Sequence, residues 1–162
     1  MAFSLELAEI FRRDLTRLAQ QMEAFPEDGL LWEVVPGVTN SAGNLALHLE
    51  GNLREFIGRI LGGQEYVRVR EREFADSGVS RAELQARALR LAEEIPAAIA
   101  GLSAEKLAEA YPVVVLGKPL SVQQFLIHLS GHFNYHLGQI DYLRRVLTGG
   151  ASVNYAGLTP AN

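Results

Sequence analysis

The sequence predicts an all-α protein, a four-helix bundle formed by one domain that spans residues 1–162. Four long segments carry apolar residues at helical spacing, and serine caps or glycine pairs mark most of their ends. A length of 162 residues is natural for one domain and is enough to bury a core.

The first two predicted helices are separated by an irregular connection with several proline and glycine residues. The first helix begins at Ser4 as N-cap and extends to about Ala24. The second begins after Ser41 and ends at Gly62-Gly63, because glycine just past a helix end tolerates positive φ. One face of the second helix carries Leu45, His48, Leu49, Asn52, Phe56 and Ile60.

A long polar segment, residues 64–78, follows the second helix and is either an ordered crossover or a mobile flap. Arginines alternate with glutamates in this segment, at Arg68, Arg70, Arg72, Glu65, Glu71 and Glu73. We interpret these residues as a solvated mixed-charge face, because alternating charge is typical of a solvent-exposed surface.

The third and fourth helices each begin with a capping box. Ser80 and Glu83 form the first box, and Pro96 should kink the third helix or limit its regular part. Ser121 and Gln124 form the second box, and the apolar pattern of the fourth helix continues until a glycine pair ends it.

The remaining segments are predicted to be short or irregular. Residues 103–110 are compatible with a further short helix, and residues 111–119 with an extended or turn-like stretch. The tail, residues 148–162, has little periodicity and is predicted to be a loop or an arm.

Composition excludes several classes of function. A net charge of −4 argues against a nucleic-acid-binding surface, which needs a surplus of Lys and Arg. The absence of cysteine excludes disulfides and cysteine nucleophiles, so any thiol chemistry must use a thiol brought by a substrate. The N-terminus lacks the features of a signal peptide, and no apolar stretch approaches the roughly 20 residues of a membrane span. We therefore expect a cytoplasmic protein without a membrane partner.

Four histidines are the chemically informative residues. His128, His132 and His136 lie four apart in one apolar run, and His48 lies in another. Residues four apart on a helix are one turn apart and about 40° around its axis, so neighbouring imidazoles can share a cation. His48 is the only histidine left to supply a third ligand from another helix.

A single histidine on an apolar helix face is usually a core residue with one hydrogen bond. Burying several imidazoles on one stripe leaves polar groups unpaired, at about 1–3 kcal/mol each, and a bound cation removes that cost. His128 and His136 are about 12 Å apart along the helix, so only one adjacent pair can join His48. The local pattern does not decide which pair.

Two segments resemble the DinB-like superfamily. Residues 132–139 resemble its H-x3-H-x-G-Q signature, and residues 40–54 resemble the N-S-x-x-N-L-x-L-H-L-x-G-N-x-R segment of its DUF1572 branch. The resemblance covers roughly residues 3–147. It implies a four-helix bundle with a long crossover between the second and third helices.

The resemblance also implies a metal site. Matched by position, its three histidines are His48, His132 and His136, and His128 becomes a pocket residue or supports a ligand. Superfamily members often form dimers, and characterised ones use the metal to activate small thiols such as bacillithiol or mycothiol. Gly138 and Gln139 of the motif are interpreted as structural, with the glutamine bonded to a neighbouring loop.

Other polar and aromatic residues near the histidines have more than one interpretation. Asn44 and Asn52 flank His48 by one turn, and each could line the pocket, orient His48 through its free ring nitrogen, or make a simple polar contact. Trp32 and Tyr135 could wall a pocket, although buried packing is favoured for both. No acidic residue in the histidine runs stands out as a general base.

Two functions are consistent with the sequence. The first is an enzyme that uses a divalent transition metal (zinc, nickel or iron) to activate a small thiol, or water, for transfer to an electrophile. The second is a non-catalytic, stress-related bundle that binds a metal or ligand and acts as a homodimer.

Overall fold

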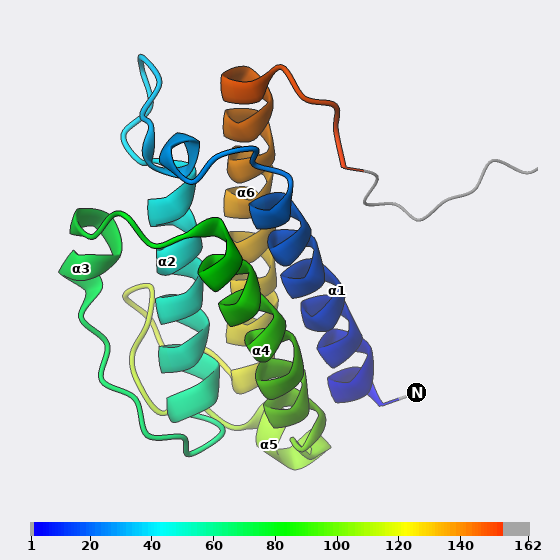
Figure 1. The fold of residues 1–162 in the computed structure, drawn as a ribbon. Coiled ribbons are helices and arrows are strands. Elements are labelled where there is room, and N and C mark those ends of the chain that lie inside the picture. The colour runs from blue at the N-terminus through cyan, green and yellow to red at the C-terminus, as the bar shows by residue number, and fades with distance from the viewer. Residues whose placement is uncertain (1, 154–162) are drawn as a thin grey trace, which may run out of the picture.

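The computed structural model describes residues 2–153 and confirms the predicted all-α bundle (Figure 1). Four long helices form it: α1 (Phe3–Glu23), α2 (Ala42–Leu53), α4 (Arg81–Ala100) and α6 (Val122–Thr148). Within the described residues, no helix is both long and apolar enough to cross a membrane.

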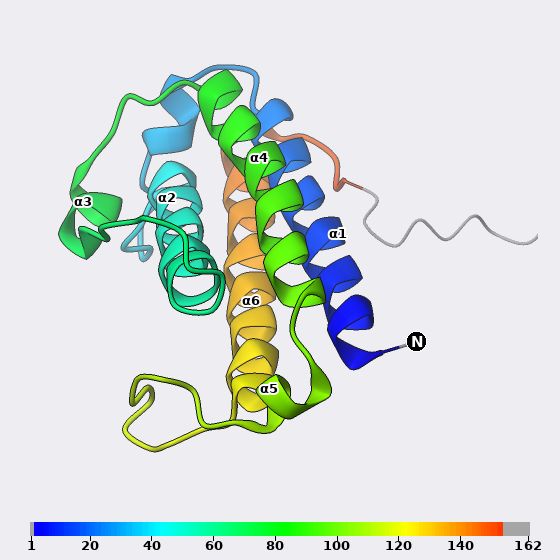
Figure 2. The same cartoon turned by 90° about the horizontal axis from the view of Figure 1, so that it is seen from below.

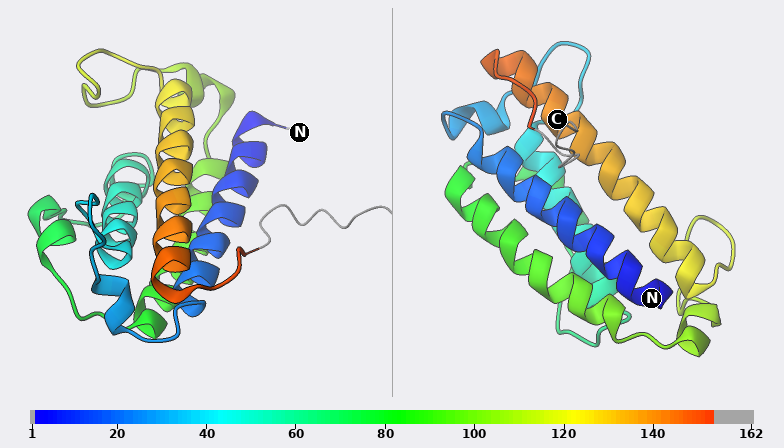
Figure 3. Two further views of the ribbon diagram at one scale, coloured as in Figure 1. Left: turned by 90° about the horizontal axis from the view of Figure 1, so that it is seen from above. Right: turned by 90° about the vertical axis from the view of Figure 1, so that its right-hand side faces the viewer.

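Helix direction explains the long crossover. α1 and α6 run toward one end of the bundle, whereas α2 and α4 run toward the other (Figures 1 and 3). Because α2 and α4 are parallel, the chain must travel back along the bundle between them. Residues 60–80 make this return, and the short helix α3 (Arg70–Ala75) in their middle lies against the outer side of α2 (Figure 2).

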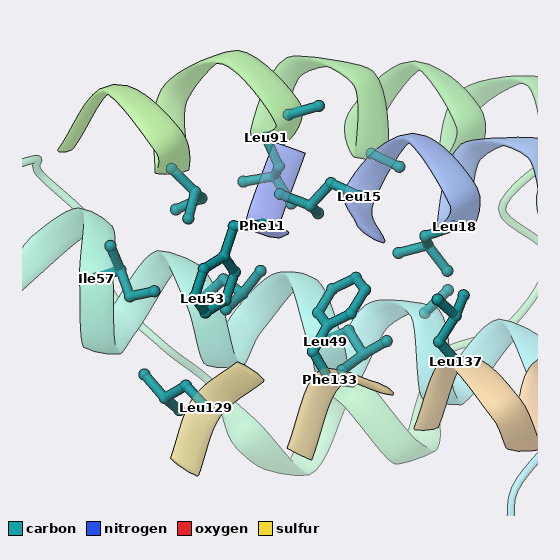
Figure 4. Close-up of a cluster of buried hydrophobic side chains, with 14 of the residues drawn as sticks. Phe11, Leu15, Leu18, Leu49, Leu53, Ile57, Leu91, Leu129, Phe133 and Leu137 are labelled. Atoms are coloured by element: carbon teal, nitrogen blue, oxygen red, sulfur yellow. The ribbon is translucent and has the colours of Figure 1, made fainter. Parts of the chain in front are cut away.

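The core is formed by side chains from all four long helices, which point toward one another in Figure 4. The labelled side chains are Phe11, Leu15, Leu18, Leu49, Leu53, Ile57, Leu91, Leu129, Phe133 and Leu137. Phe133 of α6 is 1% exposed and Leu49 of α2 is also 1% exposed, so these two helices are packed tightly at the level of the histidines. Burial of apolar surface contributes about 25 cal/mol per Å² to the free energy of folding. The packing of these side chains therefore stabilises the orientation of α2 relative to α6.

Three of the predicted helix starts are confirmed. Ser41, Ser80 and Ser121 are N-caps, and each side-chain oxygen accepts a hydrogen bond from the backbone N–H three residues on. Ser4 is not an N-cap: Ala2 holds that position, and its carbonyl accepts from the N–H groups of Leu5 and Glu6. Ser4 is instead buried in the first turn of α1.

Helix ends follow the predicted positions with two differences of detail. α2 passes into a π-helical segment, η2 (Arg54–Arg59), before the chain turns at Gly63, whose φ is +68°. α4 continues past Pro96 to Ala100, so the proline does not end the helix. At the end of α6, Gly149 adopts a φ of 66°, the left-handed conformation that glycine tolerates.

The connections contain only short elements. A 3-10 turn, η1 (Gly29–Trp32), follows α1, and α5 (Ala104–Ala108) confirms the predicted short helix. Residues 111–119 form a turn held by an isolated antiparallel bridge between Ala110 and Ser121. Of the predicted tail, residues 149–153 are irregular, and residues 154–162 lie outside the described part of the chain.

Candidate metal centre

Helices α2 and α6 bring three of the four histidines together. One nitrogen from each of His48, His132 and His136 lies within 4.8 Å of the others. The Nε2 atoms of His48 and His132 are 3.2 Å apart, and the ring of His136 is centred 4.6 Å from that of His132. The tertiary structure thus brings together the set that the resemblance implied, from residues 84 positions apart.

The outward-facing nitrogens of two of these rings are hydrogen-bonded. His48 Nδ1 lies 2.8 Å from Glu73 Oε2, and His136 Nδ1 lies 2.7 Å from Gln139 Oε1. Carboxylate and amide oxygens only accept hydrogen bonds, so both Nδ1 atoms carry the proton and donate it. Each Nε2 therefore keeps a lone pair that can bind a cation.

The ring nitrogens of His132 have a different hydrogen-bond pattern from those of His48 and His136. Its Nε2 faces an acceptor on His48, so in the metal-free state Nε2 carries the proton of His132. Its Nδ1 is buried and has no hydrogen-bond partner among residues 2–153. An unpaired buried imidazole nitrogen is an unfavourable feature. A cation bound at Nε2 would move the proton of His132 to Nδ1, so Nε2 would become a ligand while Nδ1 would still lack a partner among the described residues.

Burial keeps two of the imidazoles neutral. It lowers the pKa of His48, although the hydrogen bond and charge of Glu73 partly oppose this effect. Burial, with a smaller contribution from the neighbouring imidazoles, lowers the pKa of His132 to about 4. Both rings are thus in the form that binds metal at neutral pH.

Glu73, on α3, is the site residue that the sequence did not reveal. Its side chain is 7% exposed and accepts two hydrogen bonds from Arg68, at 2.6 and 2.9 Å. The interpretation of Arg68 and Glu73 as part of a solvated mixed-charge face is therefore wrong, whereas Arg70 and Arg72 are exposed as expected. The contact between Glu73 and His48 spans 25 positions and exists only because the crossover places α3 on α2.

Gly51 of α2 has no side chain, and this leaves room for the carboxylate of Glu73. A Cβ atom built on Gly51 would lie 2.1 Å from Glu73 Oε1, far inside van der Waals contact. Gly51 thus allows the carboxylate to reach α2, and any larger residue there would displace it.

The two asparagines near His48 do not orient its ring, because Glu73 occupies the nitrogen they would need. Asn44 donates to the backbone carbonyls of Glu73 and Asp76 at 3.1 and 3.0 Å, so it holds the end of α3. Asn52 is buried, and its Oδ1 finds no hydrogen-bond partner within the described residues.

His128 lies outside the cluster. Its side chain is exposed, its ring is 6.4 Å from that of His132, and it stacks on Phe125 at 6.0 Å. This placement agrees with its predicted exclusion from the set of three. Gln139 was expected to bond a neighbouring loop, but its oxygen accepts from His136 instead.

Aromatic side chains flank the cluster. Phe74 of α3 is centred 5.0 Å from His48, and Tyr135 of α6 is centred 5.2 Å from His136. Tyr135 is 65% exposed, so the expectation of buried packing is wrong for this residue. Trp32 is partly buried and packs against the core, and its ring nitrogen donates to the carbonyl of Val79.

Two cavities border the residues that support the cluster. One, of about 410 Å³, includes Gln139 in its lining, and the other, of about 680 Å³, includes Gly51 and Glu73. Both volumes lie in the range of sites for small molecules.

A helical bundle with three converging imidazoles defines a class of protein that is suited to hold a transition metal with an open coordination position. The comparison with family models agrees with this class: the model for mycothiol-S-transferase matches residues 6–149. The chain belongs to this family, which is part of the DinB-like superfamily. No curated protein matches the chain. The finer assignment to the DUF1572 branch stays a prediction.

Proposed function

We propose that the chain is a metal-dependent thiol S-transferase in which His48, His132 and His136 bind one divalent transition metal. The observation that carries the proposal is the convergence of three imidazole nitrogens within 4.8 Å. The family of mycothiol-S-transferases supports a small thiol as the substrate. Because the chain has no cysteine, that thiol must come from the cosubstrate.

The donor set fits such an ion. Imidazole nitrogen is a suitable ligand for zinc, nickel and iron and a poor one for magnesium or calcium. Three protein ligands leave at least one position for a substrate atom. The hydrogen bonds of His48 and His136 on their outer nitrogens are those that fix ligand rings in metal sites.

A bound divalent ion would supply Lewis-acid stabilisation of a thiolate near neutral pH. The residues of the chain provide the surroundings: burial keeps His48 and His132 neutral, and Phe74 and Tyr135 flank the cluster. Glu73 is not a free base, because Arg68 and His48 occupy both of its oxygens. The thiol proton therefore leaves to solvent, the sulfur bonds to the electrophilic carbon, and the leaving group departs with its electron pair.

Two measurements test the proposal. Elemental analysis of the purified protein should find about one equivalent of metal, and the His48→Ala variant should lose it. Metal-loaded protein should then accelerate the reaction of mycothiol with a model electrophile, relative to metal-free protein. Bacillithiol, glutathione and cysteine serve as comparison thiols.

Each negative result has a separate meaning. Full retention of metal in the His48→Ala variant would contradict the ligand assignment. Stoichiometric metal without acceleration for any thiol would favour the non-catalytic metal-binding bundle.

A further inference from the structure

The crossover between α2 and α4 contributes a buried charge to the metal site. Glu73 is only 6% exposed as a residue, and burying a carboxylate is expensive unless it is paired and hydrogen-bonded. Arg68 supplies the pairing through two parallel hydrogen bonds, the strongest geometry for an arginine and a carboxylate. An arginine and a glutamate can form such a pair at the protein surface without the cost of burial. The burial of this pair is therefore explained by a further contact of the carboxylate.

The reason lies in the third hydrogen bond of the carboxylate. Glu73 Oε2 accepts from Arg68 at 2.9 Å and from His48 Nδ1 at 2.8 Å, so one oxygen links the arginine to the imidazole. A carboxylate at Nδ1 fixes which nitrogen of the ring is protonated and fixes the direction of the other nitrogen. Nε2 of His48 then lies 3.2 Å from Nε2 of His132, and the ring of His136 is centred 5.2 Å from that of His48.

Two further features hold Glu73 in place from the side of α2. Gly51 leaves the space that the carboxylate fills, and Asn44 binds the backbone carbonyl of Glu73 itself. Gly51 lies three residues after His48 and Asn44 lies four residues before it, on the same helix. Helix α2 therefore carries His48, the glycine that leaves space for the Glu73 carboxylate, and the asparagine that binds the Glu73 backbone.

We propose that Glu73, held by Arg68, is the positioning residue for the His48 ligand, and that the crossover is thereby part of the metal centre. This inference rests on the proposed function. It makes metal affinity depend on a residue that touches no metal, and on the placement of a segment outside the four-helix core.

The experiment compares metal binding by the wild type with binding by Glu73→Ala, Glu73→Gln and Gly51→Ala variants. Dissociation constants for Zn²⁺ are measured by chelator competition, and Co²⁺ spectra report the ligand geometry. Glu73→Ala should weaken Zn²⁺ binding roughly 10- to 100-fold and alter the Co²⁺ spectrum. Glu73→Gln should recover part of the loss, because the amide oxygen still accepts from Nδ1.

Gly51→Ala is the sharper variant, because it displaces the carboxylate without changing its chemistry. It should weaken Zn²⁺ binding in the same direction as Glu73→Ala. Gly131→Ala is the matched control: Gly131 also lies within a helix, and a Cβ there meets nothing within 4 Å. This control should bind Zn²⁺ within about twofold of the wild type, since helical glycine-to-alanine changes without a clash are mild.

A second readout needs no metal. In the metal-free wild type, ¹⁵N chemical shifts should show the proton of the His48 ring on Nδ1, and Glu73→Ala should move it toward Nε2. Wild-type Zn²⁺ affinity in Glu73→Ala and Gly51→Ala, with an unchanged tautomer, would overturn the positioning role. Failure of the wild type to bind any of Zn²⁺, Co²⁺, Ni²⁺ and Fe²⁺ would instead reject the proposed function, and the inference with it.

Discussion

At the scale of single residues, the site depends on how each ring nitrogen is satisfied. His48 and His136 have acceptors on their outer nitrogens, whereas the buried Nδ1 of His132 has no partner among the described residues. Burial disfavours the charged form of an imidazole, so the pKa of His132 falls to about 4. The metal-free cluster is therefore sensitive to acid.

The stability of the metal-free protein should fall with pH below about 6.5, where an unfolded imidazole takes up a proton. Folded His132 resists protonation until about pH 4, so between these values the unfolded chain binds more protons and the free energy of unfolding decreases. The lowered pKa of His48 acts in the same direction. Urea unfolding from pH 7 to pH 4.5 measures this slope, which should be shallower in a His132→Gln variant. Equal slopes in both proteins would contradict the assignment to His132.

At the scale of elements, α3 is a short helix held at its end by one side chain of α2. Asn44 donates to two carbonyls at this end, those of Glu73 and Asp76. Six residues are too few for a stable isolated helix, so docking on α2 must hold α3 in place.

Replacing Asn44 by alanine should release the crossover. The change removes the two hydrogen bonds to the end of α3 and a third one from the Ser41 hydroxyl, worth about 1 kcal/mol each, so the loss in the free energy of unfolding should be roughly 1–3 kcal/mol. Hydrogen exchange should increase in residues 70–76 and remain slow in α1 and α4. Uniform faster exchange throughout the bundle would mean that Asn44 acts on global stability alone.

Helix α4 contributes to the stability of the bundle and not to the site, since it packs on α1 and supplies none of the clustered histidines. Leu91→Ala should lower the free energy of unfolding by about 2–5 kcal/mol, because Leu91 is 1% exposed and truncation leaves a cavity. Zn²⁺ affinity of the folded protein should stay unchanged. Leu89→Ala on the same helix is the control: Leu89 is 46% exposed, so its truncation should change stability by less than about 0.5 kcal/mol. Similar losses for the two variants would contradict the packing described.

At the scale of the whole molecule, α6 presents an apolar face to solvent beside the histidines. Its exposed apolar side chains are Ile127, Tyr135, Tyr142 and Val146, with exposed fractions between 51% and 68%. Contiguous exposed apolar surface often marks an interface between proteins. The homodimer expected from the sequence stays a prediction, and this face is where we expect its interface.

Sedimentation velocity tests the dimer directly. The wild type should sediment as a species of twice the chain mass of 17.8 kDa, and Tyr142→Lys should shift it to the monomer by placing a charge in the interface. Leu89→Lys, an exposed apolar position on α4, is the matched control and should leave the dimer intact. A monomeric wild type at micromolar concentration would reject the prediction.

Much of the architecture could be predicted from the sequence because its causes are local. Apolar spacing predicts the four long helices, and Ser41, Ser80 and Ser121 cap three of them through bonds to residues only three positions away. Ser4 was misassigned because the chain begins its first helix earlier, where Ala2 adopts the extended conformation of an N-cap without a capping side chain.

The sequence by itself determined the four long helices and the serine caps of three of them, since each depends on a few neighbouring residues. The spacing of the histidines left open which adjacent pair joins His48, and only the resemblance implied His132 and His136. Which partners meet across the bundle was decided by the tertiary structure alone. The parallel course of α2 and α4 requires a crossover, and its return path places Glu73 against His48 and Gly51. A contact between segments 25 positions apart carries no local periodicity, because its geometry is set by how helices dock and not by the spacing of residues within one helix.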